Sequence, residues 1–198
     1  MKREIMQDLI SWKNKRNRKP LLLTGVRQCG KTYILRKFGE EHFDNYVYLN
    51  LERDPQIAAV FNYDYDTKRI LQDISNLSLL PEIIPNKTLL IIDEIQFNPK
   101  AITALKYFAE DMPELCIVGA GSLLGVSLRA EGASFPVGKV DRLEMYPMSF
   151  KEFLLESKSR RIVNSIENFD ITKLLPDYIL DNLNREYTNY LLVGGMPE

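Results

Sequence analysis

A glycine-rich segment near the start of the chain has residue types and a spacing that suit phosphate binding. Residues 25–32 read GVRQCGKT, in which a lysine and a threonine directly follow the second glycine. Glycines let the backbone turn tightly and present its N–H groups to phosphate oxygens, and a helix that starts here directs its positive end at the same place. The segment therefore predicts a phosphate-binding loop, or P-loop.

Two side chains of this loop have specific roles in the pattern. Lys31 is expected to reach the β- and γ-phosphates of a nucleotide, and the Thr32 hydroxyl is expected to ligate magnesium. A coincidental glycine-rich turn is the alternative, but apolar residues precede the loop and a helical pattern follows it, as phosphate binding requires. The residues expected to contact the nucleotide here are Gly25, Val26, Arg27, Gln28, Cys29, Gly30, Lys31, Thr32 and Tyr33.

Two adjacent carboxylates follow an apolar run later in the chain. Residues 89–92 read LLII, and Asp93 and Glu94 come next. A buried strand ending here places both at the carboxyl edge of a sheet, where open α/β folds bind ligands. Asp93 is expected to hold magnesium through its water shell, and Glu94 to orient and deprotonate an attacking water. Many ordinary strands end in Asp-Glu, so this interpretation depends on the preceding P-loop.

A third element ends in a serine. Residues 115–122 read LCIVGAGS, an apolar run that gives way to small residues and then Ser122. A hydroxyl at this place would lie near the γ-phosphate and the attacking water. The alternative is a glycine-rich strand exit with a serine in the turn, where serine is frequent.

Apolar runs rich in β-forming residues are spaced widely enough for helices to lie between them. Near-continuous apolar runs are typical of strands buried on both faces. The alternation of strand and helix patterns predicts an α/β fold, with a parallel sheet and helices on both faces. A helix is expected over residues 4–12, and a fifth strand over residues 139–146. The four runs lie at residues 21–23, 46–51, 89–92 and 115–118.

The chain divides into three parts by composition and pattern. Residues 1–19 are expected to form an N-terminal helix and basic linker, residues 20–148 the P-loop core, and residues 149–198 the start of a helical lid. In the lid, Ser149 and Glu152 have the spacing of a capping box at a helix start. The chain stops at GGMPE, where another element should follow, so we expect a truncation before a C-terminal domain.

The composition excludes several classes of protein. With 45% hydrophobic and 27% charged residues, the chain resembles ordinary globular proteins. Its apolar stretches are far shorter than the ~20 residues of a membrane helix, and its first residues lack a signal-peptide pattern. We therefore expect a cytoplasmic protein without a membrane partner. Cys29 and Cys116 are too few for a disulfide framework and are expected to be reduced thiols.

Charge is distributed unevenly along the chain although the net charge is only −1. Residues 1–38 carry eleven Lys and Arg against two acids, whereas residues 39–98 carry eleven acids against four Lys and Arg. A basic cluster near the N-terminus could meet a nucleic acid backbone, but such runs are usually solvated surface, and the net charge does not support DNA binding. The cluster consists of Lys13, Lys15, Arg16, Arg18 and Lys19.

Other polar and aromatic residues are expected to have structural roles. The single histidine, His42, has the position of a helix-end surface residue. Trp12 is expected to anchor the first helix. The tyrosines are expected to pack on strands or loops, and this group comprises Tyr46, Tyr48, Tyr63 and Tyr65.

With the P-loop, the Asp-Glu pair and the serine in register, the chain resembles the AAA+ ATPases. It is most similar to the bacterial and archaeal family whose members carry a restriction-endonuclease-like domain after the ATPase core. The resemblance implies a five-stranded parallel sheet in the order 5-1-4-3-2, followed by the beginning of a small helical lid. It covers essentially the whole chain and rests on KREI, GVRQCGKT, LLIIDEIQ with Gln96, GSLLG, FPVGKVDRLEMYPMSFKEFL and YLLVGGMPE.

The resemblance also implies roles for individual residues. Lys31 and Thr32 match Walker A, Asp93 and Glu94 match Walker B, and Ser122 matches sensor one. Catalytic roles fall to Glu94, Lys31 and Ser122, and metal binding falls to Thr32 and Asp93.

For two further positions, the role that the resemblance implies has an alternative. The closing turn resembles the Gly-x-Pro motif that lines adenine in signalling ATPases, which implies that Pro197 contacts the base; a helix C-cap is the other interpretation. Lys139 stands where the family usually has an arginine. An arginine finger requires a planar guanidinium, for which Arg142 and Arg129 are the other candidates. We therefore expect slow hydrolysis without a partner.

Taken together, these features predict an enzyme that binds ATP with magnesium and hydrolyses it, coupled to movement of a C-terminal domain. Guanine selection is disfavoured because residues 86–89 read NKTL and lack the acid of the guanine-binding motif. An ATP-dependent protein-binding switch with little turnover and a DNA-associated ATPase are the alternatives. A protein partner or self-association through AAA+ surfaces also stays open.

Overall fold

The computed structural model describes residues 3–77, 82–122, 136, 138–157, 163–164, 166 and 176–196. Its centre is a five-stranded sheet in the order β2-β3-β4-β1-β5, with every neighbouring pair parallel. Counted from the other edge this is 5-1-4-3-2, so the predicted topology is confirmed. The strands are β1 (Leu21–Gly25), β2 (Asn45–Asn50), β3 (Thr88–Asp93), β4 (Cys116–Gly121) and β5 (Asp141–Met145).

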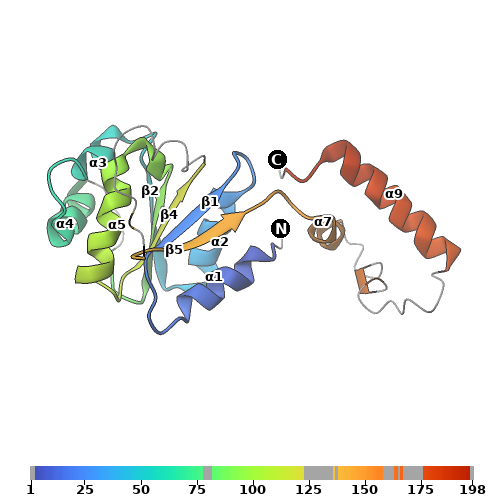
Figure 1. Cartoon of the computed structure of the whole chain (residues 1–198), viewed down its shortest axis with the longest axis horizontal. Helices are drawn as coiled ribbons and strands as arrows, with labels where there is room; N and C mark the ends of the chain where they lie inside the picture. The colour runs from blue at the N-terminus through green and yellow to red at the C-terminus, as the bar shows by residue number, and fades with distance from the viewer. Residues whose placement is uncertain are drawn as a thin grey trace.

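Helices cover both faces of this sheet, as the strand pattern predicts (Figure 1). One face carries α1 (Ile5–Lys13) and α2 (Lys31–His42). The other face carries α3 (Pro55–Val60), α4 (Thr67–Leu77) and α5 (Pro99–Asp111). None of the helices in the described ranges is long and apolar enough to cross a membrane.

The two layers explain why the strands read as continuous apolar runs. Every residue of β3 is buried. Leu90 and Ile92 belong to the core under α3, α4 and α5, whereas Leu89 and Ile91 belong to the core under α1 and α2. Because successive side chains point to opposite faces, the middle of a strand covered on both sides is apolar at consecutive positions.

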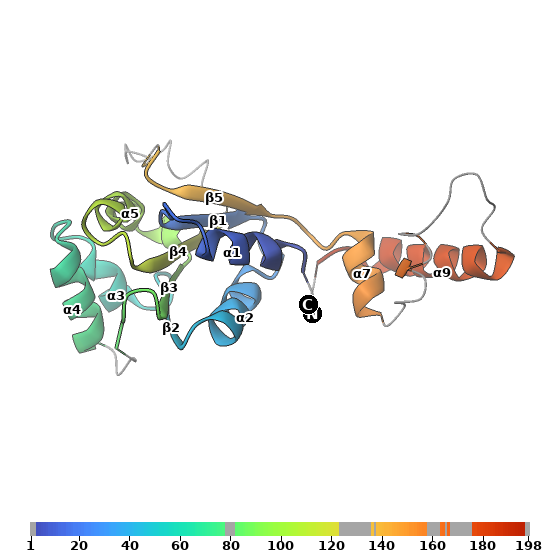
Figure 2. The ribbon, with the colours of Figure 1, turned by 90° about the horizontal axis from the view of Figure 1, so that it is seen from below.

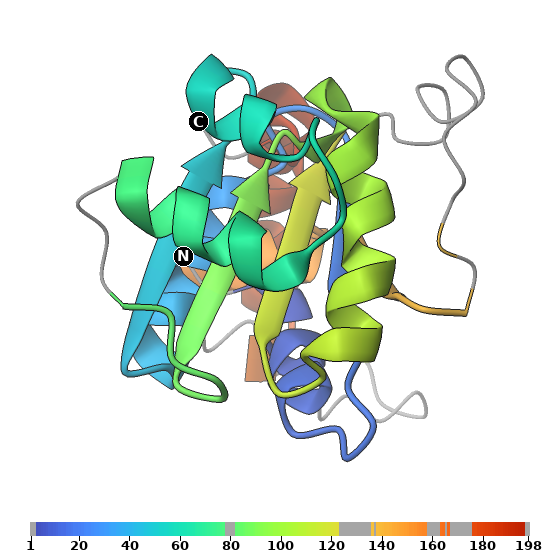
Figure 3. The same cartoon turned by 90° about the vertical axis from the view of Figure 1, so that its left-hand side faces the viewer.

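The carboxyl ends of the parallel strands meet at one edge of the sheet, as the common direction of the arrowheads in β2, β3 and β4 shows (Figure 3). Asn50 at the end of β2 pairs with Asp93 at the end of β3. Thr24 of β1 pairs with Gly121 of β4. The segments that follow these strands are therefore brought to the same edge.

Beyond β5 the chain forms two helices, α7 (Phe150–Glu156) and α9 (Asp177–Val193), which extend away from the sheet (Figure 2). The predicted capping box is present, because Ser149 accepts from the Glu152 N–H and Glu152 accepts from the Ser149 N–H. The helices meet through aromatic rings, with the centroids of Phe150 and Tyr187 5.2 Å apart. No residue of the described α9 is buried.

Several expected structural roles are also seen. Trp12, in the last turn of α1, is buried, and its indole N–H donates to the carbonyl of Lys19. Cys29 and Cys116 are buried free thiols. His42 ends α2, with its ring 5.4 Å from that of Phe38.

Candidate functional site

The predicted phosphate-binding loop connects β1 to α2. Gly25 ends the strand at a point where a Cβ would overlap the carbonyl oxygen of Met145 on β5. Gly30 precedes α2 with φ 91°, in the left-handed region that favours glycine. Both positions of the motif therefore require glycine. Gly25 allows β1 to approach the Met145 carbonyl closely, and Gly30 allows the left-handed backbone conformation.

Lys31 folds back over its own loop. Its Nζ donates to the carbonyl oxygens of Gly25 at 2.9 Å and Val26 at 2.7 Å, and the residue is only 7% exposed. The Sγ of Cys29 lies 3.9 Å from the same nitrogen. A lysine charge is thus held inside the loop, where a phosphate would be bound.

Asp93 links the loop to the end of β3. Its Oδ2 accepts a hydrogen bond of 2.6 Å from the Thr32 hydroxyl, and its Oδ1 accepts one of 3.0 Å from the backbone N–H of Glu94. The residue is 2% exposed. The structure therefore brings the two predicted metal-binding residues into direct contact.

Tyr48 is a site residue that the sequence analysis missed, because it was assigned to packing alone. It packs against the core under α1 and α2, yet its hydroxyl also donates to Asp93 Oδ2 at 2.8 Å. The Arg36 guanidinium lies 4.0 Å from the centre of its ring. Burial, followed by the hydrogen bond to Asp93, raises the pKa of Tyr48, although a hydrogen bond from Asn50 opposes the shift.

Glu94, the predicted general base, has an unusual backbone. Its φ of 52° and ψ of 40° lie in the left-handed region, which is uncommon for a residue with a side chain and is often found at functional sites. The Gln96 amide nitrogen donates to Glu94 Oε2. The Gln96 amide oxygen is buried without a hydrogen-bond partner among the described residues. In the sequence, Gln96 is distinguished only as part of the LLIIDEIQ block.

Ser122 follows β4 directly and is 2% exposed. The β1–β4 register pairs Thr24 with Gly121, so Ser122 comes level with Gly25 at the start of the phosphate loop. The structure thus brings Ser122 to the same edge of the sheet as Asp93.

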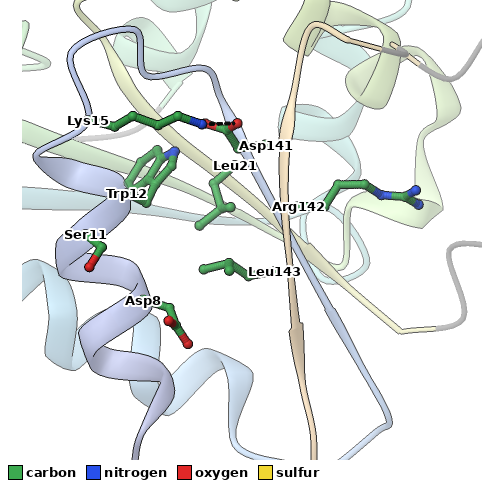
Figure 4. A pocket seen from close by; sticks show the side chains of 8 residues that line it. All are labelled: Asp8, Ser11, Trp12, Lys15, Leu21, Asp141, Arg142 and Leu143. Atoms are coloured by element: carbon green, nitrogen blue, oxygen red, sulfur yellow. Dashed lines mark hydrogen bonds and ion pairs between the residues drawn. The ribbon is translucent and has the colours of Figure 1, made fainter.

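The arginine-finger candidates lie elsewhere. Lys139 precedes β5 and forms an ion pair of 2.8 Å with Glu110 of α5. Arg142 lies on β5 with its side chain directed away from α1 (Figure 4). Arg129 lies outside the described residues. No described candidate therefore lies at the phosphate loop of its own chain.

The closing turn is described only in part. Gly194 is the C-cap of α9, with φ 79°, and its N–H donates to the Tyr190 carbonyl at 2.8 Å. Pro197, the residue implied to contact adenine, lies outside the described residues. The helix C-cap interpretation is therefore seen directly, and the adenine contact stays a prediction.

A family model decides the identity of the domain. The AAA domain model matches residues 17–154, more than half of the chain. The chain belongs to the AAA domain family. Together with the P-loop fold, this makes the protein an ATP-binding domain of the AAA ATPase type.

Two solved structures are similar to this AAA domain in fold. The Walker-type ATPase PABY2304 of Pyrococcus abyssi aligns with a TM-score of 0.57 and 16% identity, covering 99% of this chain and 64% of the other. The Drosophila ORC bound to DNA aligns with a TM-score of 0.50 and 13% identity, covering 95% and 56%. At these identities the likeness concerns the fold alone.

Curated relatives extend beyond the AAA domain. An uncharacterized protein of Methanocaldococcus jannaschii is 26% identical over 178 residues, which are 89% of this chain and 35% of that protein. An uncharacterized protein of Haemophilus influenzae is 28% identical over 192 residues, with coverage of 89% and 39%. The chain thus spans little more than a third of the length of these relatives.

Proposed function

We propose that this AAA domain binds ATP together with magnesium at the carboxyl edge of the sheet and hydrolyses it. The observation that carries the proposal is the 2.6 Å hydrogen bond between the Thr32 hydroxyl and Asp93, which joins the phosphate loop to the strand that ends in two carboxylates. A loop lysine, a following threonine and a strand-end aspartate are the parts with which P-loop NTPases hold nucleotide and metal.

Lys31 is proposed to change partners when the nucleotide binds. Its ammonium now bonds to two neutral carbonyls of the loop. Phosphate oxygens are charged acceptors, and charge-assisted hydrogen bonds are roughly twice as strong as neutral ones. We therefore expect Nζ to move to the β- and γ-phosphates, while backbone N–H groups of residues 26–33 bind the remaining oxygens.

Thr32 and Asp93 are the residues that would hold magnesium. Their oxygens are the hard donors that magnesium prefers, and magnesium usually takes only one or two protein ligands besides phosphates and water. The described residues contain no group of three or more His, Cys, Asp or Glu that could hold a metal, which suits a site completed by phosphates. When bound, magnesium supplies neutralisation of the phosphate charge.

Glu94 and Ser122 are proposed to act on the attacking water. Glu94 would accept the water proton as the oxygen attacks the γ-phosphorus in line with the bond to ADP, which leaves. Its backbone is in the left-handed region, where residue conformations of functional sites are often found. Ser122 would supply a hydroxyl contact to the γ-phosphate, since it lies level with the start of the phosphate loop.

Calorimetry and steady-state turnover on three variants test this function. Lys31→Ala should abolish detectable ATP binding. Glu94→Gln should keep binding but slow turnover by about 10²–10⁴-fold, because it removes the base and keeps the shape. Lys37→Ala is the matched control, since Lys37 lies on α2 and pairs with Glu41. Binding of equal strength in the parent and Lys31→Ala would contradict the proposal.

A nucleotide-dependent binding switch is a second candidate, which the Gln96 contact favours. The amide of Gln96 bonds to the carboxylate that should activate water, so Glu94 is engaged elsewhere. Lys139, which stands where an arginine finger is expected, is also paired with Glu110. Its ammonium lacks the planar shape of a guanidinium. Tight ATP binding, with a turnover that Glu94→Gln leaves unchanged, would favour the switch over the ATPase.

Nucleotide-dependent movement is proposed to act on parts outside this chain. Residues 149–198 would form the start of a lid that passes the movement on to a C-terminal domain. The proposal is supported by curated relatives of which this chain covers 35% and 39%. A partner protein or a second copy would supply any missing arginine, and the cytoplasm is the compartment that suits ATP turnover.

A further inference from the structure

Arg3, which precedes the first helix, has its guanidinium buried among three separate parts of the molecule. Nη1 donates to the Cys29 carbonyl in the phosphate loop at 2.9 Å. Nη2 donates to the carbonyl of Tyr146, directly after β5, at 2.5 Å. Nε donates to Glu152 Oε1 on α7 at 3.0 Å. One side chain thus joins the phosphate loop to the junction between the sheet and the first lid helix.

Several hydrogen bonds also hold the carboxylate of Glu152. Besides Arg3, its Oε1 accepts from the backbone N–H of Glu4 at 2.7 Å, and its Oε2 accepts from that of Ser149 at 2.9 Å. The Arg3 and Glu152 side chains are 3% and 7% exposed. Buried charges are tolerated when they are paired and hydrogen-bonded, and their geometry is then tightly specified.

The bond to Cys29 bears on phosphate binding through peptide geometry. The Cys29 carbonyl and the Gly30 N–H belong to the same peptide, and no cis peptide bond occurs in the described residues. In a planar trans peptide the two groups point in opposite directions. By holding the carbonyl on its own side, Arg3 directs the Gly30 N–H to the other side and polarises it as a donor.

The same pair is connected to the far end of the lid. Glu152 lies in the first turn of α7, and Met148 just before it donates its N–H to the Gly195 carbonyl at 2.6 Å. The Tyr190 hydroxyl of α9 donates to the Met148 carbonyl at 2.7 Å. A shift of either lid helix would therefore act on the segment that holds Glu152, and through it on Arg3.

We propose that Arg3 is a positioning residue of the phosphate-binding loop, and that the Arg3–Glu152 pair couples the placement of α7 to nucleotide affinity. The inference rests on the proposed function, because it assigns the means by which the loop is held ready for phosphate. It also makes Glu152, which does not contact the loop, a determinant of ATP binding.

The test measures the ATP dissociation constant in magnesium buffer by calorimetry, well below the unfolding temperature of each variant. Arg3→Met should weaken ATP binding about tenfold or more, the effect of losing one hydrogen bond to a charged group. Arg3→Lys should also bind ATP weakly, because the single ammonium nitrogen of lysine lacks the planar guanidinium whose three separate nitrogens reach these acceptors. Lys151→Ala is the matched control, since it breaks an exposed ion pair of 3.4 Å with Glu4 between the same two segments.

The double variant Arg3→Met with Glu152→Gln keeps the test decisive if a single variant fails to fold. Removing both charges leaves no unpaired buried ion, so the fold is retained more readily. Its ATP binding should be as weak as that of Arg3→Met, and Glu152→Gln alone should also weaken binding.

Folded variants that bind ATP like the parent would overturn the inference, because a purely structural pair lowers the melting temperature without changing the dissociation constant. If Lys31→Ala loses binding in the same series while the Arg3 variants do not, the inference fails and the ATP site stands. If the parent itself does not bind ATP, both fail.

Discussion

At the scale of single residues, the site depends on how firmly Asp93 is held. Its carboxylate accepts hydrogen bonds from the Thr32 hydroxyl, the Tyr48 hydroxyl and the Glu94 backbone N–H. A carboxylate that accepts several hydrogen bonds is held in one orientation, as the proposed metal-binding role requires. The Asp-Glu pattern predicts the carboxylate but not its tyrosine donor, because nothing in the β2 sequence distinguishes a packing tyrosine from one whose hydroxyl reaches the next strand.

Tyr48→Phe should lower the free energy of unfolding by about 1.5 kcal/mol near neutral pH, since a hydrogen bond to a charged group is lost. The pKa of Tyr48 is raised, chiefly by burial, above its ordinary value near 10. The stabilisation of the folded state by this hydrogen bond should therefore be fully present below pH ~10 and be lost as the pH rises through the raised pKa of Tyr48. Urea unfolding of both proteins at neutral pH, pH ~9 and above pH ~10 measures this, and a difference already lost at pH ~9 would contradict it.

Gly25→Ala should impair nucleotide binding as well as stability. An added Cβ would overlap the Met145 carbonyl, and overpacking of this kind costs about 1–3 kcal/mol. Because β1 must move to relieve it, the phosphate loop moves too. Gly138→Ala is the matched control: its left-handed φ of 73° also costs about 1 kcal/mol, but nothing lies within 4 Å of the new Cβ. ATP calorimetry should show weaker binding for Gly25→Ala alone.

At the scale of elements, the start of helix α7 shows what the sequence can and cannot predict. Ser149 and Glu152 form the expected capping box, because capping is local and its spacing is fixed. The bond from Arg3 to the same Glu152 joins residues far apart in the chain, so no local pattern indicates it. The central strands β3 and β4 could be predicted because burial on both faces requires consecutive apolar residues, and such a run is visible in the sequence.

Asn98 is a second helix cap with a long-range role. It caps α5 by accepting from the Lys100 N–H, while its amide donates to the carbonyl of Ala58 at 2.7 Å and to Asn62 at 3.1 Å. Asn98→Ala should therefore lower the free energy of unfolding by about 2–3 kcal/mol, more than a cap alone. Asp54→Ala, which removes the exposed cap of α3, should cost about 1 kcal/mol. Equal losses in urea unfolding would show that the contacts of Asn98 to the α3 region add nothing.

At the scale of the whole molecule, the proposed nucleotide site and the basic N-terminal cluster lie at opposite edges of the sheet. The site occupies the carboxyl edge, whereas the cluster precedes β1 and therefore lies at the edge where the strands begin. The parallel sheet could be predicted because apolar runs alternate with helix patterns, and the family resemblance implied its strand order. The cluster could not be interpreted from sequence, since its function depends on what each cation contacts.

The cations of the basic N-terminal cluster mostly contact other parts of the protein. Lys15 forms an ion pair of 2.7 Å with Asp141, the interaction drawn in Figure 4. Arg18 donates to Asn86 and to the carbonyl of Glu114. Two further cations bond to backbone carbonyls, namely Lys13 to His42 and Lys19 to Gly138. The cluster therefore ties the start of β1 to neighbouring segments, and binding a phosphate backbone would require it to give up these bonds.

We therefore expect DNA neither to bind tightly nor to stimulate ATP turnover. Each cation that contacts a phosphate contributes about −0.9 to the slope of log affinity against log salt, so a true interface of the cluster would lose affinity steeply with salt. Anisotropy of a labelled duplex between about 50 and 200 mM salt measures that slope, with turnover measured on the same samples. Micromolar binding with a slope of several units, weakened by Arg16→Ala and Lys15→Ala but not by the distant Lys151→Ala, would show that the cluster exchanges its protein contacts for phosphates and would restore the DNA-associated function.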